Sequence, residues 1–549
     1  MRTTLLVLSL LAGCAANDFG LDDAVGSSKF QPDGAFGAYL SGRFAAQRMD
    51  AEVAADRLEA AAAKDKQVPA VAQQAFVAAT LAGRASASRL AAGLPDNPAA
   101  QLVVANQDVL AGRWTQAEQR FTALAPSSLS QILRPLLVAW AQQGAGRTQA
   151  ALQTLEPGVE SASLRGLMAL HAALIADMGG QQESAARLYG VARGAFGTTN
   201  LRFAQLVANW QFRGGRLTEA QESIREATGL SGDLSLSTPA LEAVIAQSAL
   251  SGPADGIAEA YLAMAAALQQ QGSTEPALLL LRLSLDLRPG FTAARLVLSE
   301  AQERAGQLPQ AQATLDAVAA TDPLIATVRM RQAALLGRAK KIEPAAQILE
   351  QLATAYPDRP EPLAALGELY RIGQRFPEAA AALDRAIDRV VTPSRSAWPL
   401  FYQRAVALDR SGNWPRAEAD LRFALELAPD QPSLLNYLGY AYADQGRNLT
   451  EARSMIERAV LQRPQDGSII DSLGWVMLLQ GETAPALKQL ERAVELEPED
   501  PVVNGHLGDA LAAMGRMREA EFQWRRALIL NPEPQERERI DLRLRAVAP

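Results

Sequence analysis

The chain has 549 residues, of which 48% are hydrophobic, 5% aromatic and 21% charged, with two His and one Cys. A single Cys excludes internal disulfides and Cys-rich zinc sites, and two His exclude a His-rich metal centre. The net charge of −7 provides no general basic surface for nucleic acid. The composition is typical of a long helical protein that works by binding, and it predicts no cofactor and no metal.

The first fourteen residues are typical of a bacterial lipoprotein signal. Arg2 precedes a short apolar core at residues 5–11, and Leu11-Ala12-Gly13-Cys14 follows. The core is too short to span a bilayer, which takes about 20 residues, and it has the proportions of a cleaved signal peptide. Its end resembles a lipobox, the motif whose Cys thiol takes a diacylglycerol and whose freed amine is then acylated, with palmitate as a typical chain. The alternative is an ordinary cleaved signal that ends in a Cys by chance.

The lipobox resemblance implies removal of residues 1–13 and a lipid anchor on Cys14. It also implies sorting to the outer membrane, on its periplasmic face, because Ala15 stands where the inner-membrane retention signal has Asp. Residues 14–38 contain several Gly, Ser and Pro residues and are predicted to form a flexible tether.

From residue 39 onward the sequence repeats with a period of about 34 residues. In each unit a marker residue, usually small, is expected in the middle of a first helix, with an Ala 12 positions later and a large apolar residue about 16 positions later. A Gly seven positions after the marker predicts the left-handed residue that ends the first helix, and a Pro ends most second helices. The markers are Gly42, Phe76, Ala105, Ala139, Ala173, Ala208, Ala265, Ser299, Ala333, Gly367, Ala405, Gly439, Gly474 and Gly508.

This pattern matches the tetratricopeptide repeat (TPR) and predicts an all-α solenoid, a right-handed superhelix of about fourteen helix-turn-helix repeats. Residues 39–228 are expected to form a degenerate N-terminal array and residues 257–532 a C-terminal array. Residues 229–256 interrupt the period, with a short apolar helix at residues 240–250, and a hinge is one interpretation of this break. Residues 533–549 are expected to form a charged capping helix and a tail.

The candidate binding surface is the concave groove that first helices line in such arrays. Large rings at groove positions are typical interface anchors, and the alternative is that these rings pack between neighbouring repeats. The predicted groove residues in the last repeats are Tyr402, Asn436, Tyr437, Tyr440, Asp444, Asp471, Trp475, His506 and Asp509.

No motif for catalysis is found in the sequence, which contains neither a phosphate-binding GxxxxGK[ST] loop nor GxSxG or HExxH. We therefore predict a protein that is not an enzyme. Residues 258–272, 281–300, 434–444, 469–501 and 506–528 together resemble a family of outer-membrane TPR lipoproteins. The resemblance implies an adaptor that recruits or activates a periplasmic carboxyl-terminal processing protease and presents peptidoglycan hydrolases to it. The alternative is an assembly factor for outer-membrane proteins or polysaccharide that holds client chains in the groove.

Overall fold

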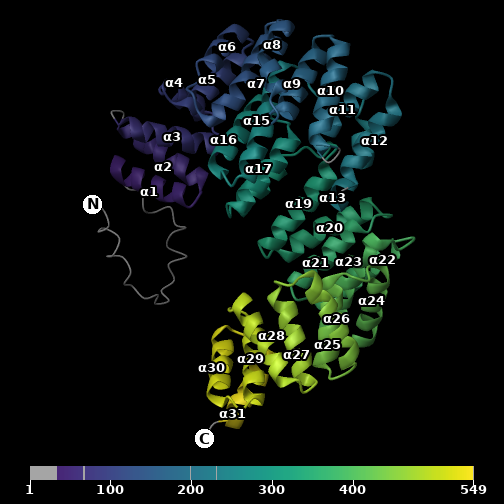
Figure 1. Ribbon diagram of the computed structural model, residues 1–549. Coiled ribbons are helices and arrows are strands. Elements are labelled where there is room, and N and C mark those ends of the chain that lie inside the picture. Colours follow the sequence, from purple (N-terminus) through teal and green to yellow (C-terminus); the bar gives the residue numbers. More distant parts are fainter. Residues whose placement is uncertain (1–33, 66–67, 198–199, 230, 548–549) are drawn as a thin grey trace. The chain divides into compact units, whose positions relative to one another are not determined.

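The computed structural model describes residues 34–65, 68–197, 200–229 and 231–547. The predicted signal peptide and Cys14 lie outside these residues, so lipidation stays a prediction. Every regular element in the described residues is a helix, and most helices form consecutive antiparallel pairs (Figure 1). The predicted all-α TPR solenoid is therefore confirmed, with fourteen helix pairs in the described part of the chain.

The structure divides into two compact units. Among the described residues, unit 1 comprises those from 34 to 229 and from 240 to 322, and unit 2 comprises those from 231 to 239 and from 323 to 547. The helices of unit 1 are α1 (Ala35–Gln47), α2 (Ala51–Lys64), α3 (Pro69–Leu81), α4 (Ser86–Ala92), α5 (Pro98–Leu110), α6 (Trp114–Thr122), α7 (Ser128–Gly144), α8 (Thr148–Glu160), α9 (Arg165–Met178), α10 (Gln182–Phe196), α11 (Leu201–Arg213), α12 (Leu217–Thr228), α15 (Pro253–Gln270), α16 (Thr274–Leu287), α17 (Thr292–Arg304) and α18 (Leu308–Asp316).

Unit 2 begins with a short inserted helix and continues as a regular array. Its helices are α13 (Gly232–Ser235), α19 (Ile325–Arg338), α20 (Ile342–Ala355), α21 (Glu361–Ile372), α22 (Phe376–Asp388), the 3-10 helix η1 (Arg395–Ala397), α23 (Trp398–Arg410), α24 (Trp414–Leu427), α25 (Pro432–Asp444), α26 (Leu449–Gln462), α27 (Gly467–Leu479), α28 (Thr483–Leu496), α29 (Pro501–Ala513), α30 (Met517–Ile529) and α31 (Pro534–Val547). A further short helix, α14 (Thr238–Ala243), spans the point where the chain returns to unit 1.

Close packing between paired helices explains the marker residues. A Cβ atom added at Gly474 would lie 2.6 Å from Cγ of Leu490, and one added at Gly508 would lie 2.5 Å from Cδ1 of Trp524. The large residue of each second helix thus fills the space that the missing side chain leaves. The predicted pairing of marker and large apolar residue is confirmed at these positions.

Each helix pair turns on one residue with positive φ, seven positions after the marker. Its φ lies between 57° and 83° in all fourteen pairs, and in eleven of them the residue is Gly, as the sequence pattern predicts. Met49, Lys340 and Gln374 adopt the same left-handed conformation without being Gly. Their Cβ atoms make this conformation costly, by about 1–2 kcal/mol each.

The helices after the break do not simply continue the N-terminal array. Helix α15 packs against α7 and α9, and α16 packs against α3 and α5, all of which are first helices of earlier repeats. Figure 1 shows this teal hairpin beside the purple and blue N-terminal helices. Residues 240–322 consequently belong to unit 1, which differs from the predicted boundary at residue 257. The sequence period could not reveal this difference, because it reports spacing along the chain and not which face a repeat covers.

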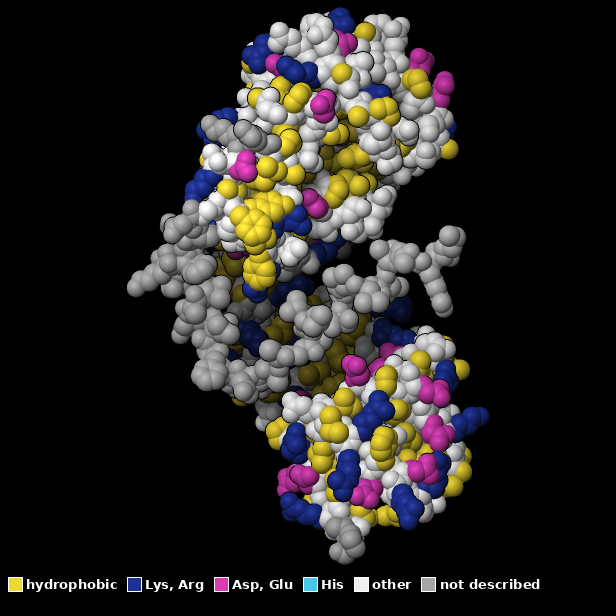
Figure 2. Space-filling view, turned by 90° about the vertical axis from the view of Figure 1, so that its left-hand side faces the viewer, with side chains coloured by type: hydrophobic (Ala, Val, Ile, Leu, Met, Phe, Trp, Pro, Cys, Tyr) yellow, Lys and Arg dark blue, Asp and Glu magenta, His cyan; other side chains and the backbone are white. Residues whose placement is uncertain are grey.

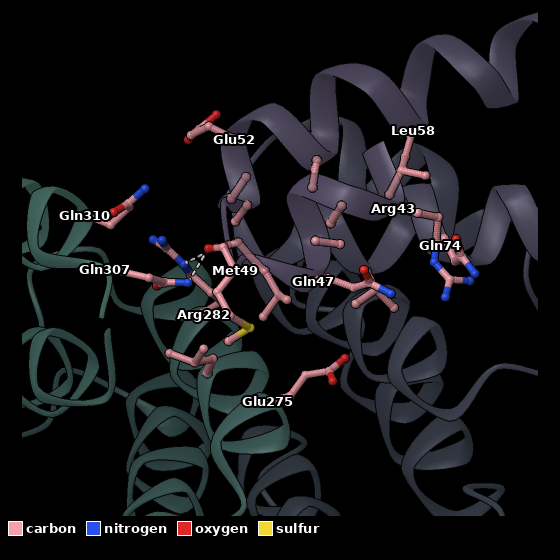
Figure 3. A pocket seen from close by; sticks show the side chains of 18 of the residues that line it. Arg43, Gln47, Met49, Glu52, Leu58, Gln74, Glu275, Arg282, Gln307 and Gln310 are labelled. Atoms are coloured by element: carbon pink, nitrogen blue, oxygen red, sulfur yellow. Dashed lines mark hydrogen bonds between the residues drawn. The ribbon is translucent and has the colours of Figure 1, made fainter. Parts of the chain in front are cut away.

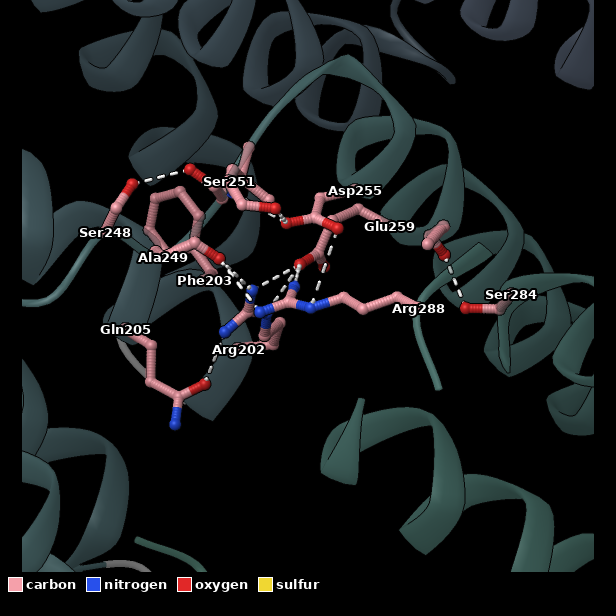
Figure 4. A network of polar contacts seen from close by, with 12 residues as sticks. Arg202, Phe203, Gln205, Ser248, Ala249, Ser251, Asp255, Glu259, Ser284 and Arg288 are labelled. Carbon is pink, nitrogen blue, oxygen red and sulfur yellow. Dashed lines mark hydrogen bonds and ion pairs between the residues drawn. The ribbon is translucent and has the colours of Figure 1, made fainter. Parts of the chain in front are cut away.

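The segment before α15 is held in place by polar contacts (Figure 4). Arg202 of α11 donates from Nε to Oε1 of Glu259 over 2.9 Å, and Arg288 Nη1 lies 3.3 Å from the same carboxylate oxygen. Both arginines also donate to the carbonyl oxygen of Ala249, each over 3.2 Å. The side chain of Asp255 accepts from the main chain of Ser251 over 2.6 Å. The predicted helix at residues 240–250 is shorter than expected, because turns replace helix beyond Ala243.

The short insertion at residues 231–239 is anchored in unit 2. Leu236 is buried beside Ala326 and Met330, and the hydroxyl groups of Ser237 and Thr327 lie 2.8 Å apart. Thr327 also donates to the carbonyl oxygen of Asp233 over 3.0 Å. The chain therefore enters unit 2, returns to unit 1, and enters unit 2 again at residue 323.

Candidate protein-binding faces

The first helices form the inner side of unit 2. Helix α19 contacts α21, α21 contacts α23, α25 contacts α27 and α27 contacts α29, whereas no two second helices in the described residues approach to the same degree. Closer spacing on one side of a stack means that the stack curves toward that side. We call the surface formed by α19, α21, α23, α25, α27 and α29 the first-helix face of unit 2, and that formed by α1, α3, α5, α7, α9 and α11 the first-helix face of unit 1.

Four of the predicted groove residues are buried inside unit 2. Asp471 is 4% exposed, Trp475 9%, His506 2% and Asp509 7%. The rings of Trp475 and His506 stack with centroids 4.1 Å apart, and His506 Nδ1 lies 2.9 Å from Oδ2 of Asp471. These side chains pack between neighbouring repeats, so the groove prediction is corrected for them in favour of the alternative reading.

Helix α31 supplies much of this burial. Arg539 pairs with Asp509 and lies over the ring of Trp475, 5.6 Å from its centroid. Asp509 also accepts from Nε1 of Trp524 over 3.1 Å and lies 3.3 Å from Nε of Arg543. The expected charged cap is present as a helix. The repeat pattern does not indicate that the arginines of this helix reach a buried carboxylate, because contacts between a cap and the preceding repeat leave no periodic signal.

The remaining predicted residues lie closer to the surface. Tyr402, Asn436, Tyr437 and Tyr440 are partly buried, and Asp444 is exposed. The rings of Tyr402 and Tyr437 meet edge to face with centroids 5.7 Å apart, and the Tyr437 hydroxyl donates to Oδ2 of Asp409 over 2.8 Å. Burial raises the pKa of Tyr437 and of Tyr440, so both phenols stay neutral hydrogen-bond donors. These five positions are the accessible part of the predicted site.

Several buried polar atoms on this face have no hydrogen-bond partner. They are Oε1 of Gln403, Oδ1 of Asn436, Oδ1 of Asp471 and Nε1 of Trp475. They lie on the first helices α23, α25 and α27. Buried polar atoms are almost always satisfied in folded proteins. Gln403 and Asn436 are only partly buried, so rotation of their side chains can bring these oxygens to a bound group, whereas Asp471 and Trp475 lie in the interior.

In unit 1 the corresponding face is already covered by the chain itself. Tyr261 of α15 is fully buried, and its hydroxyl donates to Oδ1 of Asn106 on α5 over 2.9 Å. A Cβ atom added at Gly256 of α15 would lie 2.2 Å from Cε2 of Trp140 on α7. Trp140 Nε1 in turn donates to Nδ1 of His171 over 2.9 Å, and burial lowers the pKa of His171 to about 3. An α-hairpin of this chain thus occupies the first-helix face of unit 1.

The visible surface carries both signs of charge. Figure 2 shows Lys and Arg side chains interspersed with Asp and Glu over the C-terminal end of unit 2, without an extended area of one sign. In the same unit, ion pairs such as Arg516–Glu519 and Arg525–Glu521 join side chains of opposite charge. The described helices include none with the length and apolar character that crossing a membrane requires. Among the same residues there is no group of three or more metal-ligating side chains.

Comparison with known proteins identifies the repeat. Family models of the tetratricopeptide repeat match residues 268–335, 327–359 and 402–468. A protein of Pseudomonas aeruginosa named TPR repeat-containing protein PA4667 is 30% identical over 166 residues, which cover 29% of this chain and 26% of that protein. Bacteriophage adsorption protein A of Escherichia coli K12 is 36% identical over 94 residues, which cover 17% of this chain and 9% of that protein. The chain therefore matches only a minor part of each of these relatives.

Among solved structures, the Cut9–Hcn1 hetero-tetramer of the APC/C is similar over 96% of this chain and 98% of the matched chain, with a TM-score of 0.37 and 14% identity. YrrB, a TPR protein described as having an unusual peptide-binding site, covers 34% of this chain and 91% of its own, with a TM-score of 0.28 and 20% identity. The repeated helix pairs and the family models that match residues 268–359 and 402–468 show an array of tetratricopeptide repeats.

Proposed function

We propose that this protein is a non-enzymatic scaffold that binds partner proteins on the first-helix face of unit 2. One observation carries the proposal. In unit 1 the same kind of face binds an α-hairpin, α15–α16, through aromatic packing and hydrogen bonds to first-helix side chains. The equivalent face of unit 2 keeps half-buried tyrosines and the unpartnered amide oxygens of Gln403 on α23 and Asn436 on α25.

The chemistry of that face favours a helical or extended protein segment. Tyr402, Tyr437 and Tyr440 offer apolar ring area together with hydroxyl groups, a combination that is common at protein interfaces. Asn436 Oδ1 and Gln403 Oε1 can accept hydrogen bonds from main-chain N–H groups or polar side chains of the partner. Asp444 adds one exposed negative charge at the end of α25.

We further propose that the scaffold is lipid-anchored through Cys14 on the periplasmic side of the outer membrane, where it recruits or activates a carboxyl-terminal processing protease and presents peptidoglycan hydrolases to it. Three features support this reading: the lipobox-like end of the first fourteen residues, the resemblance of residues 434–444, 469–501 and 506–528 to adaptor lipoproteins, and a similar relative whose name refers to bacteriophage adsorption, a process of the cell envelope. An anchored scaffold with several binding faces raises the local concentration of its partners to the millimolar range, on the order of what short linkers achieve.

The partner is tested by affinity capture from solubilised envelopes with protein that starts after Cys14. Recovery of a processing protease that is lost in the double variant Tyr440→Ala, Asp444→Arg supports the adaptor. Glu426→Arg is the matched control, since Glu426 is exposed on the second helix α24 and its reversal leaves the first-helix face unchanged. Recovery of envelope-assembly machinery without any protease would reject the adaptor and favour the assembly factor.

Anchoring is tested separately. The Cys14→Ala variant is expected to leave the membrane fraction and appear in the soluble periplasmic fraction. Retention of this variant in the outer membrane would show that lipidation of Cys14 does not hold the protein there.

A further inference from the structure

The first-helix face of unit 1 contains a cavity that the α15–α16 hairpin does not fill (Figure 3). The cavity has a volume of about 500 Å³, within the range of about 300–1,000 Å³ that is usual for ligand pockets. One wall comes from α1, the first half of α2 and α3, and the other comes from α16, α17 and the start of α18. Its lining includes positions of α1 and α3 that correspond to the face residues of other repeats, such as Arg43 and Val77, one position after their markers.

The floor of the cavity is apolar. Ala54, Leu58 and Ala78 on one side, and Leu278 and Leu298 on the other, are all buried. Such a floor is suited to an aliphatic side chain, because burial of a side chain of that size against apolar neighbours is favourable.

The positively charged side chain of Arg282 lies at the edge of this apolar floor. Arg282 of α16 lines the cavity and donates from Nε to the carbonyl oxygen of Leu81 over 2.9 Å. Its guanidinium makes no ion pair in the described residues. Asp286 and Glu52 attract its charge without contacting it, and Glu52 forms its ion pair with Arg84 instead. Burial lowers the pKa of Arg282, which reflects the cost of holding an unpaired charge away from water. A carboxylate in the cavity would offset that cost with charge-assisted hydrogen bonds.

Amide side chains surround the cavity as well. Gln47, Gln73, Gln74 and Gln310 contribute to its lining, and Figure 3 shows Gln47, Gln74 and Gln310 around the opening. Oε1 of Gln74 is buried without a hydrogen-bond partner. A Gln amide carries both a donor and an acceptor, so it complements the N–H and C=O groups of a peptide main chain, whereas a fatty acid has no such groups beyond its carboxylate.

We infer that this cavity binds a peptide segment of a partner protein in which an apolar side chain lies next to a carboxylate. The apolar side chain occupies the floor, the carboxylate pairs with Arg282, and the main chain hydrogen-bonds to the glutamine amides. This site lies in unit 1 and is independent of the partner proposed for the first-helix face of unit 2.

The test uses the full chain and two libraries of fluorescein-labelled octapeptides. One library has Leu, Val or Phe followed by Asp or Glu at its centre, and the other has Asn or Gln in place of the acid. Fluorescence anisotropy is expected to show micromolar binding of the acidic library and binding about tenfold weaker for the amide library. Equal binding of the two libraries, or no binding of either, would overturn the inference.

Three variants locate the site. Arg282→Gln is expected to remove the tenfold preference for the acidic library. Ala46→Trp is expected to weaken both libraries by filling the cavity, and its native side chain is exposed, so the variant keeps the fold even if Arg282→Gln does not. Arg187→Gln, with the same change of charge at an exposed position of α10, is expected to bind like the unaltered chain.

A last arm distinguishes the class of ligand. Oleate carries an apolar body and a carboxylate but no amide groups. Displacement of the acidic peptides by excess unlabelled peptide but not by oleate supports the inference. Binding of oleate at Arg282 without binding of either peptide library would show that the cavity holds an amphiphile, and the inference would be wrong. Because these measurements use purified components, their outcome does not depend on the envelope partner.

Discussion

The two histidines of the chain occupy the same repeat position in unit 1 and in unit 2. Each lies two positions before its marker and meets a Trp that lies one position after the preceding marker. In unit 1 the Trp140 and His171 rings meet edge to face, hydrogen-bonded and fully enclosed, under Gly256 of α15. In unit 2 the Trp475 and His506 rings stack, and Nε1 of Trp475 keeps no partner.

The difference comes from what covers each pair. A whole α-hairpin of the chain covers the pair in unit 1, whereas in unit 2 the single helix α31 reaches the pair with Arg539. The same repeat positions are therefore buried in both units, under a hairpin of two helices in unit 1 and under one arginine-bearing helix in unit 2. Four experiments test this contrast, with the largest expected effect first.

Replacement of Gly256 tests how the α15–α16 hairpin packs on the first-helix face of unit 1. In Gly256→Ala the new Cβ would lie 2.2 Å from a ring atom of Trp140, so α15 must shift away from α7. We expect a loss of stability of about 2–3 kcal/mol or more in unit 1, with faster amide hydrogen exchange over residues 253–287. Gly190→Ala is the control, because nothing lies within 4 Å of its Cβ position in α10, and we expect it to stabilise by about 0.5–1 kcal/mol. Unchanged exchange in Gly256→Ala would mean that the hairpin does not depend on this contact.

Removal of the Asp509 carboxylate tests the contacts that hold α31 on the last repeat of unit 2. Asp509→Ala leaves Trp524 Nε1 and Arg539 without their buried acceptor, and we expect α31 to loosen at a cost of about 2 kcal/mol. Amide exchange in α31 and iodide quenching of Trp fluorescence measure the effect. Glu521→Ala removes an exposed partner of Arg525 and should cost less than about 0.5 kcal/mol. If the two variants behave alike, Arg539 and its neighbours do not hold the cap.

Acid is expected to weaken unit 1 through His171. The folded-state pKa of about 3 lies below the ordinary value of 6.5, so between these values the unfolded chain binds a proton that the folded chain excludes. This contribution to stability is therefore fully present only well above pH 6.5, and it falls as the pH decreases through 6.5, by about 1.4 kcal/mol in total on reaching pH 5.5. Urea unfolding followed by hydrogen exchange over α7 and α9 measures this loss. His171→Gln should lack this part of the pH dependence, and an identical pH profile in that variant would contradict the assignment.

The smallest effect concerns the turns. Lys340 and Gln374 in unit 2 adopt φ values of 57° where most repeats have Gly. Lys340→Gly and Gln374→Gly are each expected to stabilise unit 2 by about 0.5–1 kcal/mol, because the strain of a side chain at positive φ is relieved. The reverse change, Gly412→Ala, should destabilise by a similar amount, since Gly412 has φ 80°. A denaturation midpoint that moves in the opposite direction would refute this account of the turns.

Most of the fold could be predicted from the sequence, because the signals involved are local and periodic. The marker glycines, the large residue about sixteen positions later and the left-handed turn residue all act within one repeat. Contacts between distant repeats leave no such period. The docking of Tyr261 on Asn106, 155 residues apart, and the cavity beside Arg282 were therefore missed.

The candidate site was predicted in part for the same reason. Repeat positions locate the first-helix face, but they do not say which part of it a cap covers. Asp471, Trp475, His506 and Asp509 were placed in an open groove because nothing in the spacing indicates that α31 folds over them. Tyr402, Asn436, Tyr437, Tyr440 and Asp444 lie nearer the surface, and their role in binding stays a prediction.

The discontinuous make-up of unit 1 has a consequence for its biosynthesis. Helices α3, α5, α7 and α9 leave the ribosome well before α15 and α16 have been translated. Residues 231–239, which belong to unit 2, are translated between these two groups of helices. During that interval Trp140, Leu102 and their neighbours on the first-helix face lack the hairpin that later encloses them. Unit 1 can therefore be completed only after residues up to 322 have emerged, and until then its earliest first helices expose apolar surface that favours aggregation.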